Sequence, residues 1–158
     1  PRRLSRPHRG PVRRLGPACV IIDTSAVIAI LRDEPEGDAC LQTTVAAERV
    51  RISAVSYVEA AAVIDRLGDP VLSRRLDELL DLLNIAIEPF DGVQARRARA
   101  AYRDFGRGSG HPARLNLGDC CAYALATSRG EPLLFKGDDF AHTDVHRVPD
   151  GHPLASDS

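Results

Sequence analysis

The sequence lacks any uninterrupted run of about 18 apolar residues, the length that a membrane-spanning helix needs. It also lacks the Cys-x-x-Cys spacing of zinc cages: its four cysteines are scattered, and two of them, Cys120 and Cys121, are adjacent. These absences argue against a membrane span, a structural zinc and a disulfide framework, and they favour reduced thiols in the cytoplasm. With 158 residues, 44% of them hydrophobic and 27% charged, the chain otherwise suits one globular domain.

The N-terminal segment differs from the rest of the chain. Residues 1–17 are rich in arginine and contain no acidic residue, although the net charge of the whole chain is −1. They contain no apolar segment, so they do not form a secretory signal, and they bury too little surface to order. We expect residues 1–18 to be a disordered basic leader, either an arm that contacts nucleic acid or, as we favour, residues translated upstream of the domain. A folded domain over 19–149 and a flexible tail over 150–158 complete the expected organisation.

Short apolar segments alternate with helical patterns from Cys19 onward. We expect strands at 19–22, 50–53, 86–87, 133–135 and 145–148, and helices at 26–31, 36–48, 56–67, 70–83, 92–105 and 117–128. This alternation predicts an α/β fold, a single domain with a central, mostly parallel sheet and helices on both faces. Ligands of such sheets bind beyond the carboxyl ends of the strands.

Acidic residues fall at the positions where such a site would form. Asp23 directly follows the first strand, Asp138 and Asp139 follow the strand near residue 134, and Glu59 and Asp119 begin two helices. Converging carboxylates repel one another and raise one another's pKa, so they need a cation. A ligand set made only of oxygen atoms selects Mg²⁺ or Mn²⁺. The pattern therefore predicts a divalent-metal site suited to phosphodiester hydrolysis.

Each acid also has an ordinary structural explanation. Ser56-x-x-Glu59 and Asn116-x-x-Asp119 have the spacing of a capping box, in which the acid only bonds the backbone at the start of its helix. Asp23 alone would be a helix N-cap, and the acidic pair near the C-terminus would be a turn. Only the placement of all four acids at one edge of the sheet favours the metal site.

Four segments, in this order, resemble the PIN-domain family, and most closely its VapC toxins of type II toxin–antitoxin modules. They are residues 20–26 (VIIDTSA), 53–59 (SAVSYVE), 115–126 (LNLGDCCAYALA) and 133–140 (LLFKGDDF). The resemblance covers residues 19–149. It implies that Asp23, Glu59 and Asp119 hold the metal, with Thr24 and Asn116 as accessory polar groups.

The fourth acid departs from the family pattern. Many PIN domains carry it in a Thr-x-Asp motif, but in this chain that position is Gly137, and the acids follow one and two residues later. We favour Asp139 as the fourth metal ligand and catalytic acid, and keep Asp138 as the alternative.

The resemblance also implies an activity and partners. The activity is that of a Mg²⁺-dependent endoribonuclease, with Mn²⁺ as a substitute, whose carboxylates activate water and leave a 5′-phosphate and a 3′-hydroxyl on RNA. The implied partner is a cognate VapB-type antitoxin that covers the acidic crevice with an arginine, in a homodimer or a toxin–antitoxin hetero-oligomer.

Arginines recur on one face of the helix expected after Asp91. Arg96, Arg99, Arg103 and Arg107 are three, four and four residues apart, and Arg114 follows in the next loop. Such a row would give an acidic nuclease a basic surface for RNA phosphates. A solvated helix face is the simpler explanation, and both interpretations stay open at this point.

Two other classes of protein are alternatives. A haloacid-dehalogenase-like phosphatase also combines a strand-end aspartate, here Asp23, with a lysine, here Lys136, and a late acidic pair. The second acid that it needs two residues after the first is Ser25 in this chain, so its general acid is missing. A catalytically silent module that binds only antitoxin or RNA is the third class, and the presence of all four acids argues against it.

Overall fold

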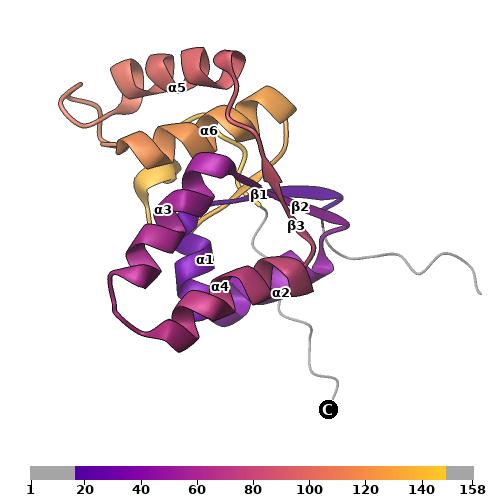
Figure 1. Ribbon diagram of the computed structural model, residues 1–158. Helices are drawn as coiled ribbons and strands as arrows, with labels where there is room; N and C mark the ends of the chain where they lie inside the picture. The colour runs from indigo at the N-terminus through magenta and orange to yellow at the C-terminus, as the bar shows by residue number, and fades with distance from the viewer. Residues whose placement is uncertain (1–16, 149–158) are drawn as a thin grey trace, which may run out of the picture.

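The computed structural model describes residues 17–148, which form one parallel sheet between two layers of helices (Figure 1). The strands are β1 (Cys19–Ile22), β2 (Arg49–Ser53), β3 (Ile85–Glu88) and β4 (Leu133–Leu134), in the order β3-β2-β1-β4. The central β1 is apolar throughout because a parallel strand in the middle of a sheet is covered on both faces.

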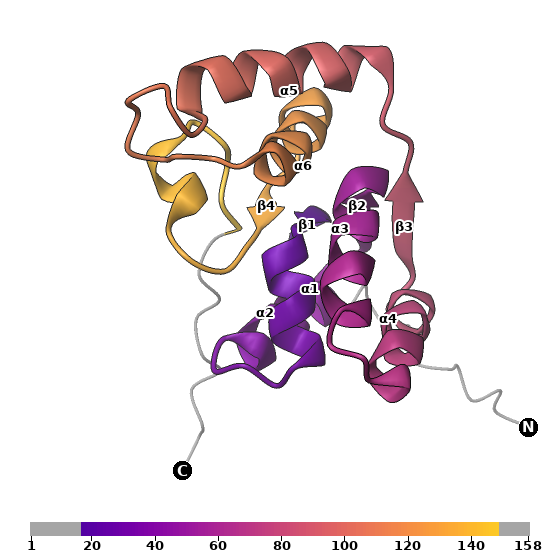
Figure 2. The same cartoon turned by 60° about the vertical axis from the view of Figure 1, so that its left-hand side comes forward.

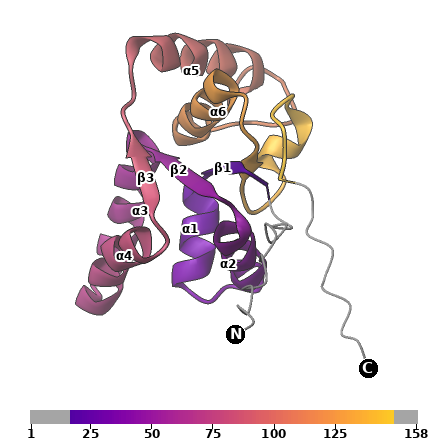
Figure 3. The ribbon, with the colours of Figure 1, turned by 90° about the vertical axis from the view of Figure 1, so that its right-hand side faces the viewer.

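Helices cover both faces of this sheet. On one face lie α1 (Thr24–Leu31), α2 (Gly37–Ala46), α3 (Ala54–Asp65) and α4 (Pro70–Leu82), and on the other α5 (Gly92–Phe105) and α6 (Leu117–Arg129). Figure 3 shows α5 and α6 above the strands and α1 and α2 below them. Alternation along β1 divides the core: Val20 and Ile22 pack with α1, α3 and α4, whereas Ile21 packs with α5 and α6.

The expected α/β class, parallel sheet and two helical layers are confirmed, and most element ends lie within two residues of expectation. The strand expected at 145–148 is wrong. That segment makes only one isolated bridge, between Leu133 and Arg147, and it follows a short 3₁₀ helix, η1 (Asp139–His142), that the pattern does not predict. Two backbone hydrogen bonds to Leu133, from its N–H to the His146 carbonyl at 2.7 Å and from the Val148 N–H to its carbonyl at 3.3 Å, hold this segment. Side chains add to them: Val145 is buried, and the Arg147 guanidinium lies 4.8 Å from the centre of the Phe135 ring.

Two expectations fall largely outside the described residues: the basic leader, of which only Pro17 and Ala18 are described, and the tail at 150–158. No helix within 17–148 has the length and apolar character to cross a membrane. All four cysteines are free, as expected, and three of them are buried.

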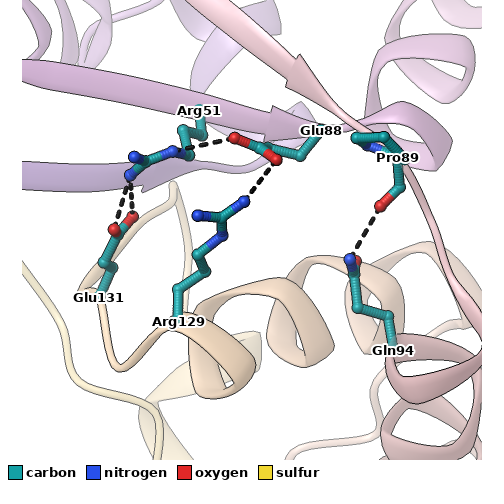
Figure 4. Close-up of polar contacts among 6 residues, drawn as sticks. All are labelled: Arg51, Glu88, Pro89, Gln94, Arg129 and Glu131. Carbon is teal, nitrogen blue, oxygen red and sulfur yellow. Dashed lines mark hydrogen bonds and ion pairs between the residues drawn. The ribbon is translucent and has the colours of Figure 1, made fainter.

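A charged network lies between the sheet and the C-terminal end of α6 (Figure 4). Arg51 of β2 donates to both carboxylate oxygens of Glu131, at 2.6 and 2.7 Å, and its Nε lies 2.9 Å from Glu88 Oε1. Arg129, at the end of α6, donates to the other oxygen of Glu88 at 2.6 Å. The side chain of Arg51 is only 13% exposed. The network therefore anchors one end of α6 to β2 and β3, which helps to fix where its other end lies.

Arg51→Ala is expected to lower the free energy of unfolding by about 2 kcal/mol, between the values for exposed and fully buried ion pairs, because Glu131 loses its cation. The matched control is Arg103→Ala, which removes an exposed pair with Asp104 and should change stability little. Urea unfolding measures both variants, and equal effects would contradict a structural role for the network.

Candidate functional site

Asp23 extends β1 by one residue and begins α1. Its backbone N–H donates to the Leu134 carbonyl at 2.9 Å, and its Oδ2 accepts from the Ser25 N–H at 2.9 Å and from the Ser25 hydroxyl at 2.6 Å. Its Oδ1 is buried and has no hydrogen-bond partner among the described residues. Burial raises the pKa of Asp23, and the charge of Asp139 raises it further. A buried carboxylate oxygen without a donor is chemically suited to bind a cation.

The residue at which α3 begins rules out the capping box as the explanation of Glu59. The helix begins at Ala54, two residues earlier than expected, because the side chain of Ser53 caps it. Ser56 is consequently buried inside the helix, and its hydroxyl has no partner among the described residues. The capping box between Ser56 and Glu59 is therefore not formed, and that interpretation is wrong.

Glu59 instead points to the end of β1. The Thr24 hydroxyl lies 3.1 Å from Glu59 Oε2 and 3.0 Å from the Ser56 carbonyl oxygen, and it can donate to either. The Glu59 carboxylate lies against Gly118 of α6, where a Cβ would come within 2.8 Å of both of its oxygens. Burial raises the pKa of Glu59, opposed by the Thr24 bond and reinforced by the charge of Asp23.

At the start of α6, the expected capping box is formed. Asn116 Oδ1 accepts from the Asp119 N–H at 2.8 Å, and Asp119 Oδ2 accepts from the Asn116 N–H at 2.7 Å. Asp119 is only 9% exposed, and burial, followed by the charges of Asp23, Asp139 and Glu59, raises its pKa to about 7. Asp119 therefore caps its helix and also lies in the electrostatic field of the other three acids.

Asp139 begins η1 and is exposed. Its charge is among the causes that raise the pKa of both Asp23 and Asp119, whereas the neighbouring Asp138 is not among the leading causes for either. Figure 2 shows η1, drawn in yellow, beside the loop that joins α5 to α6. This placement favours Asp139 over Asp138 as the fourth acid of the group, which we call the acidic site: Asp23, Glu59, Asp119 and Asp139.

The acidic site has no internal cation among residues 17–148. No arginine, lysine or histidine there forms an ion pair with its four acids. Nor do side chains in this part of the chain converge closely enough to form a ready-made group of three metal ligands. The charges of these acids raise one another's pKa although their carboxylates do not contact one another. This arrangement is compatible with a site in which an added divalent cation would bring the carboxylates closer.

The predicted arginine row lies on the exposed side of α5 and in the loop after it. Arg96, Arg99, Arg103, Arg107 and Arg114 are all exposed, and Arg103 is bound to Asp104 at 2.7 Å. A role in RNA binding stays a prediction.

The geometry argues against the phosphatase alternative. Ser25 occupies the position of the missing general acid, and its hydroxyl donates to Asp23. Lys136, the lysine that this alternative needs near the site, is bound to Glu34 at 2.6 Å.

Two residues at the site have roles that the sequence pattern does not identify. Ser25 donates twice to Asp23, and Gly118 makes room for the Glu59 carboxylate. A signal existed for Gly118, because a glycine in the first turn of a helix weakens the helix and needs a packing reason. Ser25 had no comparable signal beyond its place after a capping residue.

The described residues form one α/β domain, with a parallel sheet and four acids near the carboxyl edge of its strands. Residues 20–146 match the family model of the PIN domain, and the chain belongs to the PIN-domain family. It is 56% identical over 131 residues to Ribonuclease VapC28 of Mycobacterium tuberculosis. The aligned region covers 83% of this chain and 98% of that protein. This identity places it among the VapC proteins and confirms the resemblance.

Solved structures share the fold. The crystal structure of Mycobacterium tuberculosis VapC20, described as a sarcin-ricin loop cleaving toxin, has a TM-score of 0.67 at 13% identity and covers 82% of this chain and 98% of that chain. The structure of VapBC-5 from the same organism, described as a member of the VapBC family of toxin-antitoxin systems, has a TM-score of 0.57 at 24% identity and covers 84% and 100%.

Metal-free protein is expected to lose stability as the pH rises from about 4 to about 7. The folded state holds a proton on Asp119, whose pKa is about 7, when the unfolded state, with a value near 3.8, has released it. The effect is at most about 4 kcal/mol. Asp119→Asn keeps an acceptor for the Asn116 N–H and should flatten this part of the profile. Urea unfolding in a chelator measures both proteins, and identical pH profiles would contradict the raised pKa.

Gly118→Ala is expected to lower RNA cleavage at least about tenfold while the protein stays folded, because the new methyl group displaces the Glu59 carboxylate. The matched control is Gly92→Ala in the first turn of α5, where a Cβ meets only the far end of Arg96, at 3.9 Å. Cleavage rates and melting curves test the pair. Full activity of Gly118→Ala would show that Glu59 does not need this position.

Proposed function

We propose that this VapC protein is a toxin endoribonuclease that hydrolyses RNA phosphodiester bonds with Mg²⁺ held by the acidic site, and that Mn²⁺ can replace Mg²⁺. The observation that carries the proposal is a group of four acids that influence one another electrostatically, three of them with raised pKa values, and that have no cationic partner among residues 17–148. The family supports ribonuclease activity, since its relative VapC28 is named a ribonuclease.

Each acid has a distinct part in this proposal. Asp23 offers its unpartnered Oδ1, and Asp119 offers the oxygen that its capping bond leaves free. Glu59 is oriented by Thr24, and Asp139 closes the site from the exposed side. When bound there, a divalent ion would stabilise charge on the scissile phosphate and lower the pKa of an attacking water.

Asn116 and Thr24 are accessory groups in this scheme. Asn116 fixes the rotamer of Asp119 through the capping box, and Thr24 donates toward Glu59 Oε2. Neither needs to contact RNA to influence cleavage, because each sets the direction of a carboxylate.

The basic residues of α5 and the following loop would attract the RNA backbone. Arg96, Arg99, Arg107 and Arg114 are exposed and form no ion pair with another described residue, so their guanidinium groups are available to phosphates. Substrate affinity that falls with rising salt would follow from such contacts.

A cognate VapB-type antitoxin is the proposed partner, in a hetero-oligomer or with the toxin as a homodimer, in the cytoplasm. The VapBC-5 structure, which shares this fold, is described as part of a toxin-antitoxin system. An acidic site without an internal cation is also chemically suited to an arginine side chain from a partner, which would neutralise the carboxylates as a metal would.

Asp23→Asn and Asp119→Asn are each expected to lower Mg²⁺-dependent RNA cleavage by about 100-fold or more while the fold is retained, because each removes a charged metal ligand. The matched control is Asp81→Asn, on the exposed side of α4, which should cleave normally. Gel assays on an RNA substrate with and without a chelator measure the rates. Retained cleavage in both site variants would exclude this site, and metal-independent binding of RNA without cleavage would support a silent binding module.

Asp139→Asn is expected to lower cleavage at least about tenfold, whereas Asp138→Asn should stay near the wild-type rate, because, of the two, it is the charge of Asp139 that is among the leading causes of the raised pKa of Asp23 and Asp119. The two variants make the same chemical change on adjacent residues, so each controls for the other in the same assay. The reverse order of effects would assign the fourth ligand to Asp138.

A further inference from the structure

The Ser25 hydroxyl joins the ends of two neighbouring strands. It donates to Asp23 Oδ2 at 2.6 Å and accepts from the backbone N–H of Lys136 at 3.0 Å. Asp23 follows the central strand β1, and Lys136 lies two residues beyond β4. One hydroxyl therefore uses its single proton on the first acid of the site and its lone pair on the segment that leads to the fourth.

The bond from the Ser25 hydroxyl to Asp23 determines which oxygen of the Asp23 carboxylate is available to a ligand. Oδ2 receives two donors from Ser25, one from the backbone and one from the side chain, whereas Oδ1 receives none from any described residue. Two donors on one oxygen fix the rotation of a carboxylate, so the unpartnered oxygen is held in one direction.

The second bond of this hydroxyl, which it accepts from the Lys136 N–H, constrains the approach of Asp139. Directly after Lys136 the chain turns at Gly137, whose φ of 91° is in the region that favours glycine, and η1 begins two residues later. The Lys136 side chain is held separately, by Glu34 at 2.6 Å. Lys136 is thus fixed at both its amide and its ammonium group, and the amide contact sets the start of the turn that carries Asp139.

We propose that Ser25 is a positioning residue of the acidic site: its hydroxyl orients Asp23 Oδ1 toward the divalent cation and holds the turn that bears Asp139. The inference rests on the proposed metal-dependent function. It is separable from helix capping, because the cap needs only the Ser25 backbone N–H, which every substitution except proline keeps.

Mn²⁺ affinity of the full chain, measured by calorimetry, tests the proposal without relying on activity. Ser25→Ala should bind Mn²⁺ about tenfold more weakly than wild type, and Ser25→Thr, which keeps the hydroxyl, should restore the affinity. The matched control is Ser73→Ala, since the Ser73 hydroxyl donates to Asp65 with the same 2.6 Å distance at an exposed place between α3 and α4. This control should bind as wild type does.

Two further measurements distinguish positioning from a loss of stability. The Mn²⁺ concentration for half-maximal RNA cleavage should rise in parallel with the dissociation constant in Ser25→Ala, and saturating Mn²⁺ should recover most of the rate. Hydrogen exchange of the Lys136 amide in metal-free protein should accelerate in Ser25→Ala and not in Ser25→Thr, because only the former removes its acceptor.

If wild type binds Mn²⁺ and Ser25→Ala binds it with the same affinity, this inference is overturned and the proposed function stands. Unchanged hydrogen exchange of the Lys136 amide in Ser25→Ala would likewise overturn this inference alone. Absence of Mn²⁺ binding by wild type would overturn the proposed function together with the inference. If Ser25→Ala does not fold, Ser25→Cys replaces the hydroxyl by a weaker donor of similar size and is judged by the same criteria.

Discussion

Repulsion among carboxylates in a partly dehydrated place is the constraint on which the acidic site depends. Burial is the largest cause of the raised pKa of Asp23, Glu59 and Asp119, and charges of other acids of the site add to it. The protein does not relieve this repulsion with a lysine or arginine of residues 17–148, because the ion pairs found there lie elsewhere. Asp23, Glu59 and Asp119 are instead held by hydrogen bonds from serine, threonine or backbone groups, which orient a carboxylate without adding a compensating charge.

The fold supplies that orientation through its most regular parts. β1 is buried on both faces, so the residue that leaves it, Asp23, starts from a rigid position. The network of Arg51 with Glu88, Glu131 and Arg129 holds the far end of α6, and the capping box holds the near end with Asp119. Ion pairs and the acidic site are thus separated: the cations in these pairs join parts of the scaffold, and the four acids form no ion pair with another described residue.

Much of the fold follows from the sequence, because its signals are local. The apolar run of β1 and the caps at Asp69, Asp91 and Asn116 are local features of the chain, and these helices begin at the expected residues. The final segment could not be predicted in this way. Its pattern suits a strand, but β4 is only two residues long and offers it one bridge, at Leu133, so the pairing ends there and the side chains of Val145 and Arg147 make the other contacts.

The site was predictable to a lesser degree. The positions of Asp23 and Asp119 depend on a strand end and a helix start, which the pattern locates. The environment of Glu59 depends on contacts between distant segments, with Thr24 on α1 and Gly118 on α6, which no local pattern contains. The same holds for Ser25, whose hydroxyl matters only because β4 lies beside β1. The choice between Asp138 and Asp139 stays a prediction, and it too depends on the path of the chain after Gly137, which no local pattern contains.

The capping box of α6 has a consequence for how such a protein can lose its activity by mutation. Asp119 bonds the backbone that starts its own helix, so most replacements damage the fold together with the site. Glu59 bonds no backbone group, and its loss leaves α3 capped by Ser53. Where selection favours a protein that is inactive but still folded, inactivating substitutions should therefore accumulate at Glu59 and Gly118 in preference to Asp119. The acids of one site would then differ in how readily they are lost over generations.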